Sequence, residues 1–353
     1  MWAFLRRHAS VLRFVVGLLL GALALWAVAG QRGELTDAAN ELGHLSVGWL
    51  VLGIVAEALS VVAFAEIQGA PLRAGDVRIP QLRLIGLTTA AGAIASSIPA
   101  GPAVSSVFAF RQYRRFGADD ALSAWTLAVT FVSSALGLSL LTAIGLGLAV
   151  RQGAAFDLIG VTLGVLFLAI VATAILWQRR ALSQVALAGL RALRRVTGRP
   201  RREEAVVLAE LISRFGGVRL TWRDFMKALG WSVANWSCDC ACLACGYLAV
   251  HAAIPWQALL LAYGAGQLAS NLPITPGGLG VVEGSLTIAL VAYGGSQAST
   301  VGAVLLYRIV SFWGFLPLGW LAYLGIVLRD RSAERRAVRR AVAAPELRER
   351  DPA

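Results

Sequence analysis

The sequence predicts an all-α polytopic integral membrane protein, built as an inverted-topology repeat with six full spans and two broken re-entrant helical hairpins. The composition is the first indication, because 58% of the 353 residues are hydrophobic and only 15% are charged, whereas soluble domains carry roughly 25% charged residues. The apolar residues also gather in runs of about twenty, the length of a helix that crosses a bilayer. The net charge of +12 does not indicate a nucleic-acid partner, because the cations lie between the apolar runs.

Six uninterrupted apolar runs are long enough to be full spans, and they cover residues 11–30, 45–65, 121–150, 158–178, 228–250 and 300–328. The first run follows basic residues and ends in small ones, as a signal peptide does. We expect it to remain as an uncleaved first helix, because everything after it is also membrane-embedded. Cleavage near residue 29 would leave the remaining topology unchanged.

Two further stretches, 84–110 and 257–293, are apolar but interrupted. The first break is the run Ser-Ser-Ile-Pro-Ala-Gly-Pro at 96–102, and the second is Asn-Leu-Pro-Ile-Thr-Pro-Gly-Gly-Leu-Gly at 271–280. Proline removes a backbone donor and glycine frees the backbone, so neither stretch is one continuous helix. Irregular backbone at membrane depth must lie within protein or face a watery cavity. Each stretch is therefore a kinked span or a re-entrant hairpin.

The arginines favour the re-entrant hairpins, because short cytoplasmic loops collect Lys and Arg. With a cytoplasmic N-terminus and two re-entrant hairpins, only Arg32, Arg151 and Arg308 of the 32 cationic residues fall outside the cytoplasmic side. If 84–110 crossed the membrane instead, basic loops would lie on both faces. We therefore predict a protein of the cytoplasmic (inner) membrane with both termini in the cytoplasm.

This topology divides the chain into two repeats. Residues 1–150 form the first, and residues 151–328 form the second, which is inverted because each repeat has three full crossings. A basic cytoplasmic segment at 179–226 lies within the second repeat, and a basic cytoplasmic tail covers 329–353. Paired Gly/Pro-interrupted segments in two inverted halves are typical of a transporter's binding site.

Four intramembrane ionisable residues are candidates for function, because such groups are costly in hydrocarbon. Glu57 and Asp239 lie in matching helices of the two repeats, which indicates one central site. Glu283 follows the second break by about one turn, where a carboxylate either caps freed backbone donors or takes part in transport. Arg308 is expected to pair with an acid, to hold a lipid phosphate, or to extend to the outer surface.

The two breaks also create anion sites, because a half-helix that begins at membrane depth presents unpaired amides and the positive end of its dipole. We expect a lipid phosphate to pass along the two turns while its acyl chains stay in the bilayer. The predicted substrate-binding residues are Glu57, Ser97, Pro99, Gly101, Pro102, Asp239, Asn271, Pro273, Thr275, Pro276, Gly277, Gly278, Glu283 and Arg308.

No metal or cofactor is predicted. Four cysteines lie at 238, 240, 242 and 245, but their helical spacing suits tetrahedral ligation poorly, so we expect them to pack between helices. There is no nucleotide-binding motif. With only three histidines in the chain, no Ser/His/Asp catalytic triad can be recognised either. We therefore expect no enzymatic activity.

The run from Leu272 to Glu283, Leu-Pro-Ile-Thr-Pro-Gly-Gly-Leu-Gly-Val-Val-Glu, resembles the signature of the lysylphosphatidylglycerol synthase transmembrane-region family. The family is also called flippase-like, or uncharacterised membrane protein family 0104. The counterpart at 98–104 lacks the double glycine, and the resemblance covers nearly all of residues 10–328. In two-domain members, the membrane region translocates an aminoacylated phospholipid that a separate soluble domain makes. Because only a 25-residue arginine-rich tail follows Leu328, we expect no synthase activity.

The predicted function is therefore flippase-like translocation of an anionic or aminoacylated phospholipid, or of a polyprenyl-phosphate lipid. One alternative is a non-catalytic membrane partner of a separately encoded lipid-modifying enzyme. Another is a membrane glycolipid transferase, which would need a carboxylate pair at a membrane surface and a nucleotide-sugar site, and we find neither. The sequence does not specify the lipid, the coupling ion, the direction or the oligomeric state.

Overall fold

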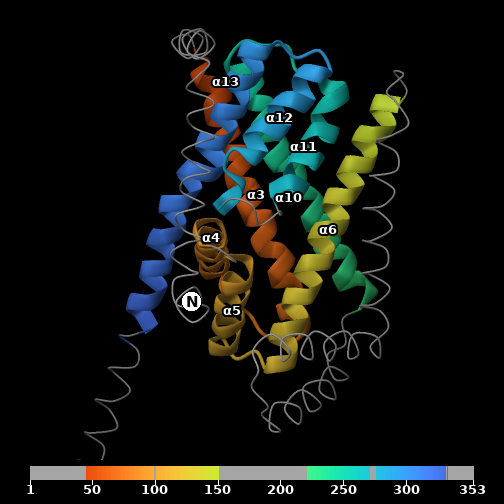
Figure 1. The fold of residues 1–353 in the computed structure, drawn as a ribbon. Helices are drawn as coiled ribbons and strands as arrows, with labels where there is room; N and C mark the ends of the chain where they lie inside the picture. Colours follow the sequence, from red (N-terminus) through yellow and green to blue (C-terminus); the bar gives the residue numbers. More distant parts are fainter. Residues whose placement is uncertain (1–44, 99–100, 151–220, 271–275, 331, 333–353) are drawn as a thin grey trace, which may run out of the picture.

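The computed structural model describes residues 45–98, 101–150, 221–270, 276–330 and 332, and these residues form a bundle of helices without a strand (Figure 1). Three helices in this part of the chain are long and apolar enough to span a bilayer: Val47–Ala74, Asp120–Leu148 and Gln297–Asp330. The prediction of a polytopic helical membrane protein is confirmed. The predicted spans 11–30 and 158–178, residues 179–220 and most of the tail lie outside the described residues.

Two helices from different halves of the chain, α3 (Val47–Ala74) and α10 (Trp222–Ala249), pack together in the centre of the bundle (Figure 1). Gly53 permits their close approach, since a Cβ there would lie 3.3 Å from the Cβ of Cys245. The amide Nδ2 of Asn235 donates to the carbonyl and hydroxyl oxygens of Ser60 at 3.0 and 2.8 Å. Asn235 of α10 is thus turned toward α3 rather than toward lipid.

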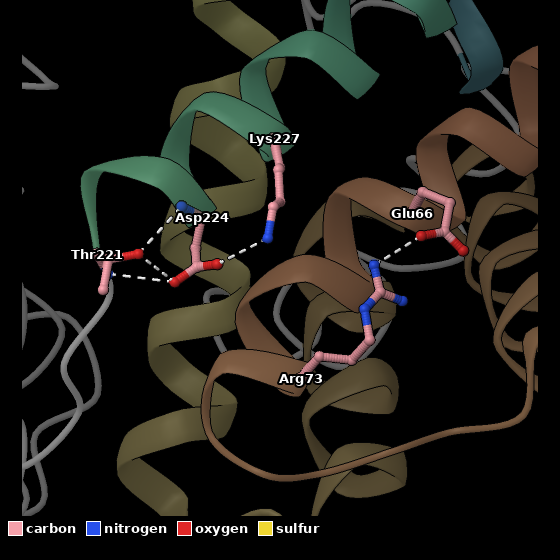
Figure 2. A network of polar contacts seen from close by, with 5 residues as sticks. All are labelled: Glu66, Arg73, Thr221, Asp224 and Lys227. Atoms are coloured by element: carbon pink, nitrogen blue, oxygen red, sulfur yellow. Dashed lines mark hydrogen bonds and ion pairs between the residues drawn. The ribbon is translucent and has the colours of Figure 1, made fainter.

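The first turn of α10 carries a capping box. The hydroxyl oxygen of Thr221 accepts from the backbone amide of Asp224 at 3.3 Å, and the Asp224 carboxylate accepts from the Thr221 amide at 3.4 Å (Figure 2). This reciprocal pairing satisfies two amides that a helix start leaves without intrahelical partners. The side-chain hydrogen bond from Thr221 is the main cause that lowers the pKa of Asp224 below its ordinary value.

At the same end of this helix pair, α3 is longer than the apolar pattern predicts. Helix α3 continues past residue 65 to Ala74, because buried Ile67 and Leu72 keep packing after the run becomes polar. Glu66 and Arg73 form an ion pair at 2.7 Å along this extension (Figure 2).

The first broken hairpin is made of α4 (Gln81–Ser97) and α5 (Gly101–Arg115). The break falls where the sequence predicts it, and a Cβ on Gly101 would lie only 2.1 Å from the carbonyl oxygen of Ala95, so the turn requires glycine there. Gln68 of α3 holds the hairpin, since its Nε2 donates to Thr88 Oγ1 at 3.1 Å and its Oε1 accepts from the Tyr113 hydroxyl at 2.5 Å.

The second broken hairpin is made of α11 (Trp256–Ser270), the 3-10 turn η1 (Pro276–Gly278) and α12 (Val281–Ala292). Gly277, Gly278 and Gly280 have φ values of +62, +68 and +78°, a left-handed conformation that favours glycine. Figure 1 shows α4 and α5 in the lower half of the bundle and α11 and α12 in the upper half. The two hairpins therefore enter from opposite ends, as an inverted repeat requires.

Two long helices flank the hairpins. Helix α6 covers Asp120–Val150. The last long helix, Gln297–Asp330, comprises α13 (Gln297–Arg308), the π-helical turn η2 (Ile309–Gly314) and a further helical stretch. At one end of the bundle, Arg115 pairs with Asp330 and Arg114 pairs with Asp120. These ion pairs join the end of α5 to both flanking helices.

Candidate functional site

The turns of the two hairpins meet inside the bundle. A Cβ added to Gly277, in the turn of the second hairpin, would lie 3.2 Å from the carbonyl oxygen of Ser96, near the end of α4. The same Cβ would lie 2.3 Å from Cε2 of Phe312 in the π-helical turn. The break in each repeat thus lies against the other break, and both lie beside the irregular part of the last helix.

A buried ion pair fastens the second turn. Arg308 donates from Nε to Glu283 Oε1 at 2.6 Å and from a terminal nitrogen to the carbonyl oxygen of Gly277 at 3.1 Å. The other oxygen of Glu283 accepts from the amide of Gly280 at 2.7 Å. The guanidinium also lies 4.4 Å from the ring centroid of Phe312. Arg308 is therefore buried and paired rather than extended to the surface, and Glu283 caps the start of α12.

A second polar cluster surrounds Asp239 on α10. Its Oδ2 accepts from the hydroxyl of Tyr263, from Gln267 Nε2 at 3.1 Å and from the hydroxyl of Tyr307 at 3.2 Å. Gln267 also donates to the Tyr307 oxygen at 3.0 Å. These donors come from α11 and α13, so this one carboxylate oxygen joins three helices of the second repeat.

The opposite side of Asp239 faces Glu57 on α3. The two acids lie at the same level of the α3–α10 contact, between the Gly53–Cys245 approach and the Asn235–Ser60 hydrogen bonds. Glu57 Oε2 and Asp239 Oδ1 are both closed off from solvent, and neither has a hydrogen-bond partner among the described residues. The sequence predicted that these acids would share a central site because they occupy matching helices, and the structure brings them together.

Three polar residues of this cluster were absent from the predicted site: Tyr263, Gln267 and Tyr307. Tyr263 and Gln267 are four residues apart and therefore lie on one face of α11, and this pairing within an otherwise apolar run was the available signal. Tyr307 directly precedes Arg308 in the sequence, but nothing in the spacing indicates that it faces α10.

The remaining predicted site residues belong to the turns. Ser97 donates to the Ala93 carbonyl at 2.6 Å and accepts from Trp320 Nε1 at 3.1 Å, which ties the first turn to the last helix. The carbonyl of Pro102 accepts from Ser105 and Ser106. Pro276 and Gly278 lie in the 3-10 turn. Pro99, Asn271, Pro273 and Thr275 lie outside the described residues.

The cysteines pack along α10. Cys242 and Cys245 lie against Gly53 of α3 at the closest approach of the two helices. Within the part of the chain that the structure describes, no group of three His, Cys, Asp or Glu side chains is placed to hold a metal ion.

A groove of about 570 Å³ lies between α5 and the last helix, and we call it the basic groove. Arginines and aromatic side chains dominate its wall, and Arg115 and Gln112 both contact the carboxylate of Asp330. Its lining residues are Phe108, Phe110, Arg111, Gln112, Arg114, Arg115, Tyr323, Val327 and Asp330.

A protein-family model described as "Lysylphosphatidylglycerol synthase TM region" matches residues 14–319, a range that contains both hairpins, the Glu57–Asp239 pair and the Arg308–Glu283 pair. No curated protein matches the chain.

Proposed function

The chain belongs to the lysylphosphatidylglycerol synthase TM region family, and from this premise we propose that it translocates an anionic lipid across the cytoplasmic membrane. The substrate class that we propose comprises anionic or aminoacylated phospholipids and polyprenyl-phosphate lipids. Family membership and the apolar helices make it a membrane protein linked to lipid handling. Translocation without a catalytic step is the further proposal.

The observation that carries the proposal is the meeting of the two broken turns, where Gly277 approaches the carbonyl of Ser96. Broken helices at the interface of inverted repeats form the substrate sites of many transporters. Because each repeat contributes one hairpin, a movement of one repeat against the other would change the contact between the turns. A soluble or purely structural bundle has no need for two such breaks at the same depth.

The basic groove supports an anionic headgroup as the substrate. Arginine binds phosphate through parallel hydrogen bonds, and the groove offers Arg111, Arg114 and Arg115 beside the aromatic rings of Phe108 and Tyr323. Arg114 and Arg115 also pair with Asp120 and Asp330, whereas Arg111 has no ion pair among the described residues. We propose that a lipid phosphate contacts Arg111 first.

The second hairpin has a different role in this proposal. Glu283 already places a carboxylate at the start of α12 and caps Gly280, in the position that a phosphate would otherwise take. We therefore propose that Glu283 and Arg308 hold the second turn in shape. The phosphate then passes by the start of α5, where Pro102 is exposed.

Reconstitution in liposomes tests the proposal. Labelled phosphatidylglycerol, aminoacyl-phosphatidylglycerol and a polyprenyl-phosphate lipid would be compared in vesicles that contain the purified protein. Arg111→Gln should slow the movement of the anionic lipids, and Asp239→Asn should slow translocation generally. Glu66→Gln is the matched control, since it also neutralises one acid of the bundle but lies in the ion pair with Arg73, away from both turns.

The outcomes separate the possible functions. Movement of one lipid class that Arg111→Gln slows and Glu66→Gln does not would support translocation and identify the substrate class. If the folded protein moved none of these lipids, translocation would be excluded. The role of a non-catalytic membrane partner for a separately encoded lipid-modifying enzyme would then be favoured.

A further inference from the structure

The contact between Glu57 and Asp239 contains a mismatch of hydrogen-bonding groups. An ionised carboxylate only accepts hydrogen bonds, yet Glu57 Oε2 and Asp239 Oδ1 lie at the same level of the α3–α10 contact, closed off from solvent and without a hydrogen-bond partner among the described residues. Two negative charges this close within an apolar bundle repel strongly. A single proton between the two oxygens removes both problems, because it turns one acid into a donor.

The neighbouring groups indicate which acid carries that proton. Asp239 Oδ2 accepts hydrogen bonds from Tyr263, Gln267 and Tyr307, and three donors on one oxygen stabilise a carboxylate. Among the described residues, Glu57 Oε2 has no hydrogen-bond donor, and helix α3 brings no cation to this level of the bundle. The proton therefore belongs on Glu57, which donates to Asp239 Oδ1.

No cation of the described residues replaces the proton. Arg308 is the basic residue on the helices packed around the pair, and its guanidinium is already engaged by Glu283 and by the Gly277 carbonyl. The other titratable groups that face the pair are neutral donors or thiols: Cys238, Cys240 and Cys242 on α10, Tyr263 on α11 and Tyr307 on α13. Within the part of the chain that the structure describes, the pair is thus an acidic site without a positive partner of its own.

From this geometry we infer that Glu57 binds the proton that drives lipid translocation, an inference that rests on the proposed function. Glu57 belongs to the first repeat and Asp239 to the second, so their hydrogen bond lies across the contact between the repeats. With the proton in place, the bond holds α3 against α10. When the proton leaves, both oxygens become acceptors that repel, and the contact between the repeats is weakened at the depth of the two turns.

Glu57→Gln is the informative variant. Its amide nitrogen takes the place of the protonated oxygen and donates to Asp239, so the protein keeps its packing but has no proton to release. Glu66→Gln on the same helix is the matched control, because it makes the same acid-to-amide substitution at a half-buried acid that pairs with Arg73. Size-exclusion profiles and melting temperatures would establish that both variants fold.

The first readout is independent of transport. Infrared spectra of the purified protein at neutral pH should show the carbonyl band of a protonated carboxyl group. The band should be lost in Glu57→Gln and retained in Glu66→Gln. A wild-type spectrum without this band, or a band that Glu57→Gln leaves unchanged, would overturn the inference.

The second readout uses liposomes with labelled phosphatidylglycerol and an imposed pH difference. One proton moved per lipid shifts the distribution of lipid between leaflets by up to about tenfold per pH unit. We expect the pH difference to shift the lipid distribution in vesicles with the wild type or Glu66→Gln. In vesicles with Glu57→Gln, the distribution should not depend on the pH difference. Wild-type translocation that ignores a pH gradient, or that responds only to a sodium gradient, would overturn the inference and leave the proposed function intact. Absence of translocation would exclude both.

Discussion

At the scale of single residues, the molecule uses its few intramembrane charges in two different ways. Arg308 and Glu283 neutralise each other in contact, with Arg308 only 7% exposed. Glu57 and Asp239 are two acids at one level of the α3–α10 contact, each with a buried oxygen that has no partner among the described residues, and none of the described cations pairs with them. A matched pair of opposite charges is suited to a fixed structural role, whereas a pair of like charges changes its interaction with each proton gained or lost.

The Arg308 pair leads to a prediction about stability. Arg308→Lys keeps the charge, but an ammonium group cannot reproduce the fork that contacts both Glu283 and the Gly277 carbonyl. One buried, charged hydrogen bond is lost, and we expect a cost of about 2 kcal/mol, seen as a melting temperature several degrees lower in detergent. Arg73→Lys, in the more exposed pair with Glu66, should cost less than about 1 kcal/mol. Equal effects of the two substitutions would contradict a fastening role for Arg308.

The cap of α10 leads to a prediction about pH. Because the hydrogen bond from Thr221 lowers the pKa of Asp224 in the folded protein, the charged carboxylate stabilises the fold above the ordinary aspartate pKa of about 3.9. That stabilisation is lost as the pH falls through the lower, folded-state value. Asp224→Asn should therefore lower the melting temperature by about a degree at pH 7, and the difference should vanish in acid. A difference in melting temperature that stays the same in acid would contradict this role of Asp224.

At the scale of elements, the positions of the helix breaks could be predicted from the sequence more accurately than the contacts between helices. Proline and glycine act locally, so the interruptions near Gly101 and Gly277 could be predicted from neighbouring residues alone. The pairing of Glu57 with Asp239 followed from the internal repeat. The pairing of Arg308 with Glu283 did not, because helical periodicity does not say which faces of two helices meet. The same reason explains why Tyr263 was missed.

The second turn allows a direct test of its glycine requirement. Gly277→Ala would place a Cβ 2.3 Å from the Phe312 ring in a backbone with φ of +62°, so strain and overlap should together cost more than about 2 kcal/mol. Gly284→Ala is the matched control within α12, because a Cβ there would meet no atom within 4 Å. In a helix interior, that change should be neutral or stabilising by up to about 1 kcal/mol. Melting temperatures of the two variants should therefore move in opposite directions or differ by several degrees.

At the scale of the whole molecule, charge is distributed along the bundle axis. The described basic residues other than Arg308 lie at the end of the bundle where α3 and α5 end and where α4, α6 and α10 begin. The loops at the opposite end, between α10 and α11 and between α12 and α13, carry no Lys or Arg. By the preference of cytoplasmic loops for basic residues, we expect the basic end to face the cytoplasm.

Cysteine labelling in cells tests this orientation. Arg78→Cys places a thiol in the exposed loop after α3, and Ala253→Cys places one in the exposed loop between α10 and α11. A membrane-impermeant maleimide should label Ala253→Cys in intact cells and Arg78→Cys only after the membrane is opened. The wild type is the background control, since its four cysteines lie within α10 and three of them are buried. The reverse labelling pattern would invert the orientation. Labelling of both sites from one side would contradict the bundle itself, because the fold places these two loops at opposite ends of α3 and α10.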